Sequence, residues 1–436
     1  MSKPKLSKHF EGRQPSAIRL SQIEFMKRND NVQDINTAIG NVSLPAHPKL
    51  QERMFDLKSS DSPFKNGAIK YTSTVGLKET NAAFLNIIAS SGFNTDGLYS
   101  QITDGGSQAM ELLTVGLCGD AGTEDAPLLL IDAAYTNYNA MASRVGRKTV
   151  SVTRNLQEDG KFTLPDRAEI EEIINKYKPN AMVVIPYDNP TGHFYDFASM
   201  KMLAELCVKY NMWMVSDEAY RELFYTEDKT SSVWGITDAD VPGIEGRRVS
   251  IETASKVWNA CGLRIGAIIT DNEALHVKAV AENTANLCSN AIGQYIFGGL
   301  AKENHDSLKK WYSQLRNYYK EMMVRLSNDL KQALPGIIVS SPDASIYSVV
   351  DVRNLVNSNF DASDFVMYCS KEGKVEINGV YYTLLVSPMA GFYSVEKGEA
   401  NPGKTQMRIA YVATPEEMKL VPKLFKELFN AYITRQ

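Results

Sequence analysis

The sequence lacks the residue patterns that mark secreted, membrane-spanning or metal-binding proteins. Its five cysteines stand singly, and their odd number without Cys-x-x-Cys spacing argues against a disulfide framework or a zinc site. Its five histidines have no metal-binding spacing either, so no metal site is predicted. No apolar run approaches the roughly 20 residues of a membrane span, and the N-terminus has no apolar signal segment. We therefore expect a soluble cytoplasmic protein.

The charge balance does not point to a nucleic-acid partner. The 436 residues include 47 basic and 51 acidic side chains, a formal net charge of −4, and the basic N-terminal residues Lys3, Lys5 and Lys8 are the one block of like charge. Nucleic-acid-binding domains concentrate positive charge on one face. The length predicts two or three domains, and the 44% hydrophobic content suffices for a large core.

From about residue 100 to 300, short apolar runs alternate with helical periods. The runs lie at 101–103, 128–132, 149–152, 182–186, 213–216, 249–252 and 265–270, and the helical periods include 109–117, 170–177 and 200–210. This alternation predicts an α/β fold with a mostly parallel central sheet between helices. Ligands of such sheets gather beyond the carboxyl ends of the strands.

The C-terminal third has a different pattern, which predicts a smaller α+β domain. A long helix is predicted over 300–331, followed by strands at 337–340, 346–352 and 407–412 and a final helix over 415–432. At the other end, residues 1 to about 35 are expected to form a polar arm with one helical patch at 18–26.

Lys256 is the most informative residue of the chain. It follows the apolar run 249–252, at a strand end, and a desolvated lysine beside cationic groups becomes a nucleophile that forms imines. Arg264, eight residues later, can hold a phosphate together with the Thr253 hydroxyl. Backbone N–H groups of Gly105-Gly106-Ser107-Gln108, before a helix expected from about Ala109, can bind the same phosphate.

Three polar residues at other strand ends suit a heteroaromatic ring. Asp217 either caps a helix or pairs with a protonated ring nitrogen. Tyr220 either packs in the core or donates to a phenolic ring oxygen. Asn189, in the turn Asn189-Pro190-Thr191-Gly192, can direct its amide at that oxygen. With Lys256, this set fits pyridoxal 5′-phosphate (PLP).

Two further residues complete the candidate site. Tyr135 follows the run 128–132, where it either belongs to the core or stacks on a flat ring. Arg408 lies inside the apolar run 407–412, and arginines in such positions are rarely buried without a partner. It either forms a structural salt bridge or grips a substrate carboxylate with two parallel hydrogen bonds.

The order and spacing of these residues resemble the class I/II aminotransferases of PLP fold type I, from about Asn36 to the C-terminus. The resemblance implies that Lys256 holds the cofactor, Asp217 meets its pyridine nitrogen, and Asn189 and Tyr220 bind its ring oxygen. It assigns the phosphate to the Gly106-Ser107-Gln108 turn, Thr253 and Arg264, ring stacking to Tyr135, and the substrate α-carboxylate to Arg408.

The resemblance adds two residues that local patterns do not mark. Gly40 matches a glycine near the substrate carboxylate. Tyr71 matches a tyrosine that reaches the phosphate of the neighbouring subunit, which implies a homodimer with shared active sites. The resemblance also divides the chain into an arm with part of the small domain (1–50), a large PLP-binding domain (51–305) and a small C-terminal domain (306–436).

Some residues depart from the family pattern. Pro186-Tyr187-Asp188 stands where the family often has Asn-Pro-Asn, and Thr253 where serine is commoner. The segment 392–405 is long and is expected to border the substrate side-chain pocket, where specificity is set.

The expected function is a PLP-dependent aminotransferase that moves an amino group from an L-α-amino acid to a 2-oxo acid by a ping-pong mechanism. Resemblance to aspartate aminotransferases suggests aspartate or glutamate as a substrate. The alternative is a PLP-dependent C–S lyase or β-elimination enzyme on the same fold, because residues that bind the cofactor do not separate these reactions.

Overall fold

The computed structural model describes residues 4–341, 343–395 and 398–435. Its centre is a seven-stranded sheet in the order β2-β8-β7-β6-β5-β3-β4. β8 runs antiparallel to β2 and β7, and the other neighbouring pairs are parallel, which confirms the predicted mostly parallel sheet. The strands are β2 (Tyr99–Thr103), β3 (Leu128–Asp132), β4 (Thr149–Thr153), β5 (Ala181–Val184), β6 (Trp213–Asp217), β7 (Arg248–Thr253) and β8 (Gly266–Thr270).

Helices bury both faces of the middle of this sheet, which explains why inner strands such as β3 and β5 are nearly continuous apolar runs. Successive residues of a strand point to opposite faces. Leu128 and Leu130 of β3 therefore share a cluster with Leu113 of α5, whereas Leu129 shares another with Leu203 of α8. The helices of this part are α3 (Pro48–Phe55), α4 (Lys78–Ser90), α5 (Gly105–Leu117), α6 (Asn137–Arg144), α7 (Arg167–Tyr177), α8 (Phe197–Lys209), α9 (Glu273–Asn283) and α10 (Ala291–Phe297).

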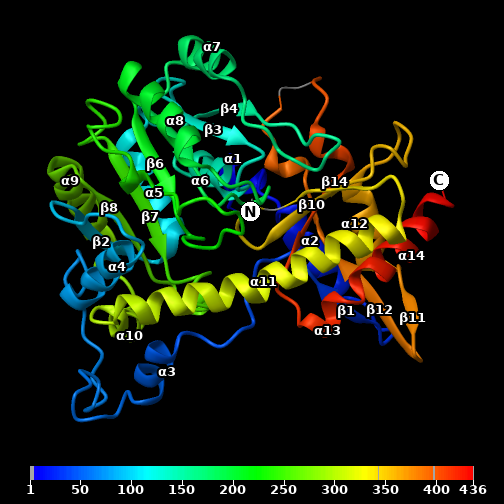
Figure 1. The fold of residues 1–436 in the computed structure, drawn as a ribbon, viewed down its shortest axis with the longest axis horizontal. Coiled ribbons are helices and arrows are strands. Elements are labelled where there is room, and N and C mark those ends of the chain that lie inside the picture. Colours follow the sequence, from blue (N-terminus) through cyan, green and yellow to red (C-terminus); the bar gives the residue numbers. More distant parts are fainter. Residues whose placement is uncertain (1–3, 342, 396–397, 436) are drawn as a thin grey trace.

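A second part of the molecule holds two smaller sheets, and the long helix α11 (His305–Ala333) runs from the first part to the second (Figure 1). One sheet has the order β13-β14-β10-β9 and is antiparallel; the other is β1-β12-β11, in which β1 is parallel to β12 although they are far apart in sequence. The elements are β1 (Gln33–Asn36), β9 (Ile338–Val339), β10 (Tyr347–Asp351), β11 (Val375–Ile377), β12 (Val380–Leu385), β13 (Ser387–Pro388), β14 (Gln406–Ala410), α2 (Ala17–Phe25), α12 (Ala362–Lys371), α13 (Pro415–Met418) and α14 (Val421–Ile433). Domain boundaries near residues 50 and 305 stay a prediction.

Three expected helix limits differ in the structure. α11 begins at His305 rather than 300, because the Asn304 side chain accepts a hydrogen bond from the Asp306 N–H and caps the helix. The C-terminal helix is two helices, because Pro422 has no N–H to continue the first one and stands in the first turn of the second. α5 begins at Gly105, four residues before the expected start near Ala109.

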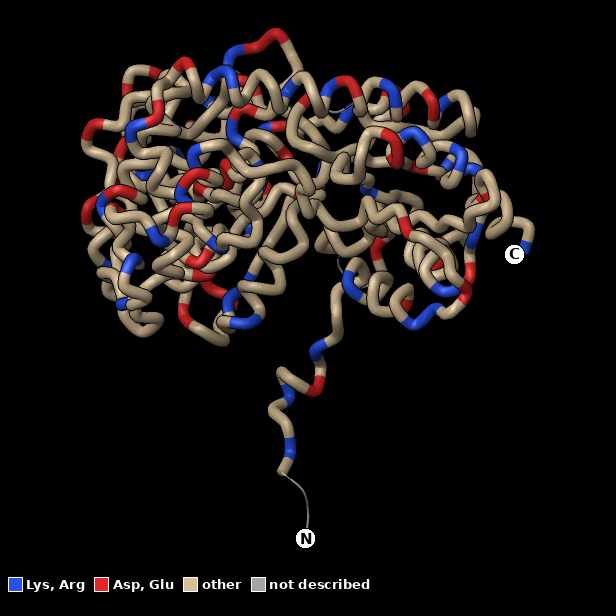
Figure 2. Tube along the Cα trace, turned by 90° about the horizontal axis from the view of Figure 1, so that it is seen from below, with Lys and Arg blue, Asp and Glu red and all other residues tan. Residues whose placement is uncertain are grey.

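The described residues before α2 extend away from the body of the molecule and include the short helix α1 (Lys8–Glu11) (Figure 2). Figure 2 also shows basic and acidic residues interspersed along the chain. No helix in the described ranges is both long and apolar enough to cross a membrane.

Candidate active site

A cavity of about 630 Å³ lies where β5, β6 and β7 end and where β10 and β14 of the second part face them. Its size is that of a small-molecule site. The structure brings most of the sequence-predicted residues into its wall: Gly40, Gly106, Ser107, Tyr135, Asn189, Asp217, Tyr220, Thr253, Lys256, Arg264 and Arg408. Gln108 and Tyr71 are not among the lining residues.

Lys256 forms part of this wall. Its Nζ donates a short hydrogen bond to the Gly40 carbonyl oxygen, which the segment after β1 supplies. A Cβ added at Gly40 would lie 3.2 Å from this Nζ and would overlap the Tyr347 hydroxyl. Only glycine therefore leaves room for both groups beside the chain at position 40.

One end of the cavity is built to hold an anion. It contains the N-terminus of α5, where Asp104 makes no side-chain capping bond, so the first N–H groups stay available. Gly105 has a φ of +74°, and a Cβ there would lie 2.5 Å from Nη2 of Arg264. The guanidinium of Arg264 thus stands beside the helix start, next to the lining hydroxyl residues Ser107 and Thr253.

Gln108 has a different place from the rest of its turn. Its Oε1 accepts from the Asp104 N–H at 2.6 Å, and its Nε2 donates to Asn283 Oδ1 at 3.2 Å. The side chain therefore stabilises the loop before α5, outside the cavity. Tyr71 is 80% exposed on this single chain. Its contact with a neighbouring subunit stays a prediction.

Asp217, at the end of β6, is a half-buried carboxylate that lines the cavity. Its Oδ2 accepts from the Tyr138 hydroxyl at 2.5 Å and its Oδ1 from the Ala219 N–H at 3.1 Å. Turns follow it rather than a helix, so the helix-cap alternative is wrong. Burial raises the pKa of Asp217 above its ordinary value. Within the described part of the chain no cationic side chain pairs with it, and a cationic ligand would stabilise its charged form.

Arg408 on β14 is only 3% exposed and points into the cavity. Its Nη1 donates to Asn189 Oδ1 at 2.7 Å and its Nη2 to the Ala38 carbonyl at 2.8 Å. Its buried Nε has no hydrogen-bond partner. No carboxylate among the described residues pairs with Arg408, so the salt-bridge alternative is wrong and the guanidinium remains able to bind an external carboxylate.

The family model described as aminotransferase class I and II matches residues 47–420. The chain belongs to this family. The aspartate aminotransferase of Sulfurisphaera tokodaii is 24% identical over 414 residues, which cover 94% of this chain and 93% of that protein. Human kynurenine–oxoglutarate transaminase 3 is 27% identical over 267 residues, 56% of each chain. A solved single-mutant structure of Thermus thermophilus aspartate aminotransferase covers 98% of this chain and 100% of its own, with 20% identity and a TM-score of 0.79.

PLP is the cofactor of this aminotransferase, and the residues present fit it. The anion-binding end suits its phosphate, and the Lys256 amine lines the same cavity. The half-buried Asp217, which pairs with no cationic side chain of the described residues, suits a protonated ring nitrogen. Tyr135 lines the cavity, where its hydroxyl accepts a hydrogen bond from Asn137 Nδ2 at 2.7 Å. The described residues contain no cluster of His, Cys, Asp and Glu side chains able to hold a metal ion.

Sequence patterns did not reveal three residues of this aminotransferase site. Tyr138 is the hydroxyl partner of Asp217, and its place on α6 three residues after Tyr135 was the available signal. Tyr347, at the start of β10, lines the cavity and shares a hydrogen bond with Tyr220. Arg19, on α2, also lines the cavity. The last two come from elements whose position against the large sheet only the three-dimensional structure defines.

Proposed function

We propose that this aminotransferase moves the amino group of an L-α-amino acid with a negatively charged side chain, such as aspartate or glutamate, to a 2-oxo acid by a ping-pong mechanism. The main support for the negatively charged side chain is a cavity arginine that has no carboxylate partner among the described residues. Arg19 lines the cavity, contacts Gln22 Oε1 at 3.5 Å and, within the described ranges, pairs with no carboxylate. The printed name of the Sulfurisphaera relative, aspartate aminotransferase, supports a dicarboxylic substrate.

Each of the other cationic groups of the cavity has its own proposed task. Arg264 holds the phosphate, Arg408 binds the substrate α-carboxylate, and Lys256 holds the cofactor. Both the amino acid and the 2-oxo acid carry an α-carboxylate, so Arg408 serves each in turn, as a ping-pong order requires. Arg19 is then the group left for a second carboxylate at the far end of the substrate.

The chain's residues also account for the proton transfers. The released amine of Lys256 is the base proposed to take the proton from the substrate Cα and to return it later. PLP, when bound, supplies a ring that accepts the electrons left at that carbon. Asp217 would keep a positive charge on the ring nitrogen, and Asn189 and Tyr220 would hold the ring oxygen. Asn189 and Tyr220 are buried, which excludes water and would strengthen their interactions.

We also propose a homodimer, and a cytoplasmic location. Exposed apolar side chains support the dimer: Phe55 at the end of α3 is 77% exposed, Ile69 is 64% exposed and Leu287 is 54% exposed. Ile69 and Tyr71 lie on the segment between α3 and α4, and the Leu287 carbonyl accepts a hydrogen bond from the Thr74 hydroxyl at 2.8 Å, so these side chains belong to neighbouring segments. A second subunit would cover such side chains.

L-Glutamate and L-glutamine have nearly the same size but differ in side-chain charge, so comparing them as amino donors tests the substrate class. We expect the wild-type kcat/KM for L-glutamate to exceed that for L-glutamine, and Arg19→Met to reduce this ratio about tenfold through the loss of a partly solvated charge-assisted contact. Arg13→Met, which removes an exposed arginine of the same segment outside the cavity wall, should leave the ratio unchanged. Equal rates with both donors in the wild type, or an unchanged ratio in Arg19→Met, would contradict the proposal.

A further inference from the structure

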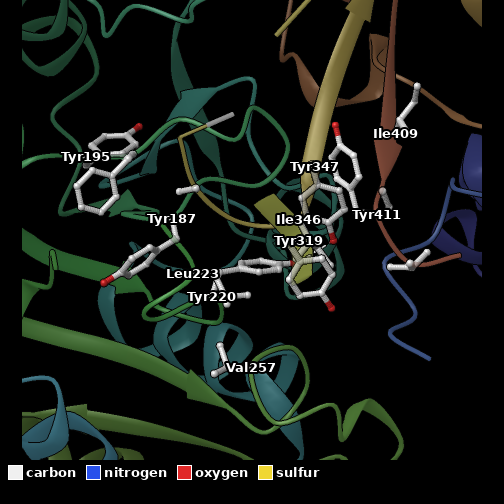
Figure 3. Packing of buried hydrophobic residues seen from close by; sticks show 14 of the residues in the cluster. Tyr187, Tyr195, Tyr220, Leu223, Val257, Tyr319, Ile346, Tyr347, Ile409 and Tyr411 are labelled. Carbon is white, nitrogen blue, oxygen red and sulfur yellow. Dashed lines mark hydrogen bonds between the residues drawn. The ribbon is translucent and has the colours of Figure 1, made fainter. Parts of the chain in front are cut away.

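Tyr347 occupies the point where the two parts of the molecule meet at the cavity. It is the first residue of β10, is only 2% exposed and lines the cavity. Its hydroxyl lies 2.7 Å from the hydroxyl of Tyr220, which comes from the turn after β6, and the two rings meet edge to face with centroids 5.7 Å apart (Figure 3). The two phenols therefore join the small antiparallel sheet to the cofactor side of the site.

The same hydroxyl lies beside the reactive amine. A Cβ added at Gly40 would overlap the Tyr347 hydroxyl and would lie 3.2 Å from Lys256 Nζ. Both groups therefore lie against the side of Gly40 where another residue would carry its side chain. The Gly40 carbonyl in turn accepts the hydrogen bond of Lys256. Gly40 thus provides the space in which the phenol and the amine approach each other.

The ring of Tyr347 has a second neighbour, the guanidinium of Arg408. The Arg408 Cζ lies 4.2 Å from the ring centroid of Tyr347 and 5.1 Å from that of Phe392. Strand pairing fixes this contact. β10 and β14 are antiparallel neighbours with Val349 opposite Arg408, and Tyr347, two residues before Val349, points to the same face of the sheet. A cation over an aromatic face is stabilised, most strongly when both are desolvated.

We propose that Tyr347 is a positioning residue with two separable tasks: its hydroxyl orients Tyr220 toward the cofactor, and its ring supports Arg408 for the substrate carboxylate. A phenol has one O–H proton. If Tyr220 donates its proton to the ring oxygen of PLP, Tyr347 must donate to the Tyr220 oxygen. This second bond polarises Tyr220 and makes it a stronger donor.

Tyr347→Phe isolates the task of the hydroxyl. The visible absorbance of the PLP-loaded protein without substrate is titrated with pH. Donation by Tyr220 favours the deprotonated ring oxygen, so a weaker donor moves the midpoint upward, by about 0.5 to 1 pH unit for one hydrogen bond. The dissociation constant of L-glutamate should stay within about twofold of wild type, because the ring under Arg408 is retained.

Tyr347→Leu isolates the task of the ring. Loss of the aromatic face should weaken L-glutamate binding at least about fivefold beyond the effect of Tyr347→Phe. Tyr411→Phe is the matched control: Tyr411 is fully buried, its hydroxyl lies 2.6 Å from Ser348 Oγ, and it is not among the cavity-lining residues (Figure 3). It should alter neither the midpoint nor the glutamate affinity.

The proposal rests on PLP-dependent amino transfer at this site, and the outcomes separate the two. A wild-type protein that binds PLP but transfers no amino group would refute the proposed function. An active wild type whose midpoint is unchanged in Tyr347→Phe would overturn only the role of Tyr347. So would Tyr347→Leu that binds glutamate as tightly as Tyr347→Phe, or Tyr411→Phe that shifts the midpoint equally. Melting temperatures of all three variants show whether each remains folded.

Discussion

Replacement of Arg408 by lysine keeps the positive charge but removes the geometry of the guanidinium. Arginine has five N–H donors. Two of them bind Asn189 and the Ala38 carbonyl, which leaves three, including the buried Nε without a partner. Two of these three can bind the two oxygens of a carboxylate in parallel. The single nitrogen of lysine cannot make both those bonds and the two internal ones.

The expected size of the effect follows from the loss of one charge-assisted hydrogen bond. Such a bond is worth about 1.5–3 kcal/mol, which corresponds to a dissociation constant for the amino donor weaker by about 10- to 100-fold. The rate of the first half-reaction, followed by absorbance at increasing L-glutamate concentration, gives this constant. PLP affinity should change much less than this constant, because Arg408 reaches the cofactor side only through Asn189. Arg167→Lys, at an exposed position of α7, serves as the matched control. A constant within twofold of wild type would refute the assignment of Arg408.

Three further changes test the site and its surroundings. Lys256→Ala should abolish turnover while circular dichroism shows an intact fold; near wild-type activity would rule out its role as the base. Asp188→Asn leaves the buried guanidinium of Arg154, 2.9 Å away, without its partner charge, and should lower the free energy of unfolding by about 3–5 kcal/mol; an unchanged midpoint of urea unfolding would contradict this. Burial raises the pKa of Glu218 to about 7, so the folded state binds more protons than the unfolded state between its ordinary pKa and 7. Stability should therefore fall as pH rises from about 4.5 to about 7, and Glu218→Gln should flatten this slope in melting temperatures; an identical slope in both proteins would refute the cause.

The inner strands of the large sheet were predictable because they are buried on both faces. β3 consists of five consecutive buried residues, so the apolar run alone gave its limits. The residues placed after β5, β6 and β7 were predictable for a related reason: carboxyl ends of parallel strands meet at one edge, so Asn189, Asp217 and Lys256 converge.

Contacts between distant segments were not predictable from local patterns. β1 pairs with β12, more than 340 residues later, and this pairing brings the segment after β1, with Gly40, to Lys256. Tyr347 begins a strand that was expected, but nothing in the run 346–352 shows that its side chain meets Tyr220. Such contacts depend on how the two parts of the molecule pack.

The segment 392–405 was expected to border the substrate side-chain pocket, and its role stays a prediction. Phe392 at its start contacts Arg408, whereas residues 396–397 lie outside the described residues. The departure at Asp188 does have a structural account. Its carboxylate pairs with Arg154 and accepts hydrogen bonds from the Thr191 N–H and hydroxyl, which fixes the turn that carries Asn189.

The most direct test of the account is the visible absorbance of the purified PLP-loaded protein on addition of L-glutamate or L-aspartate without an acceptor. We predict that the yellow colour is lost with a stoichiometric yield of the 2-oxo acid and returns when a different 2-oxo acid is added. Persistent colour with continuous release of ammonia would instead indicate an elimination reaction and contradict amino transfer between dicarboxylic substrates.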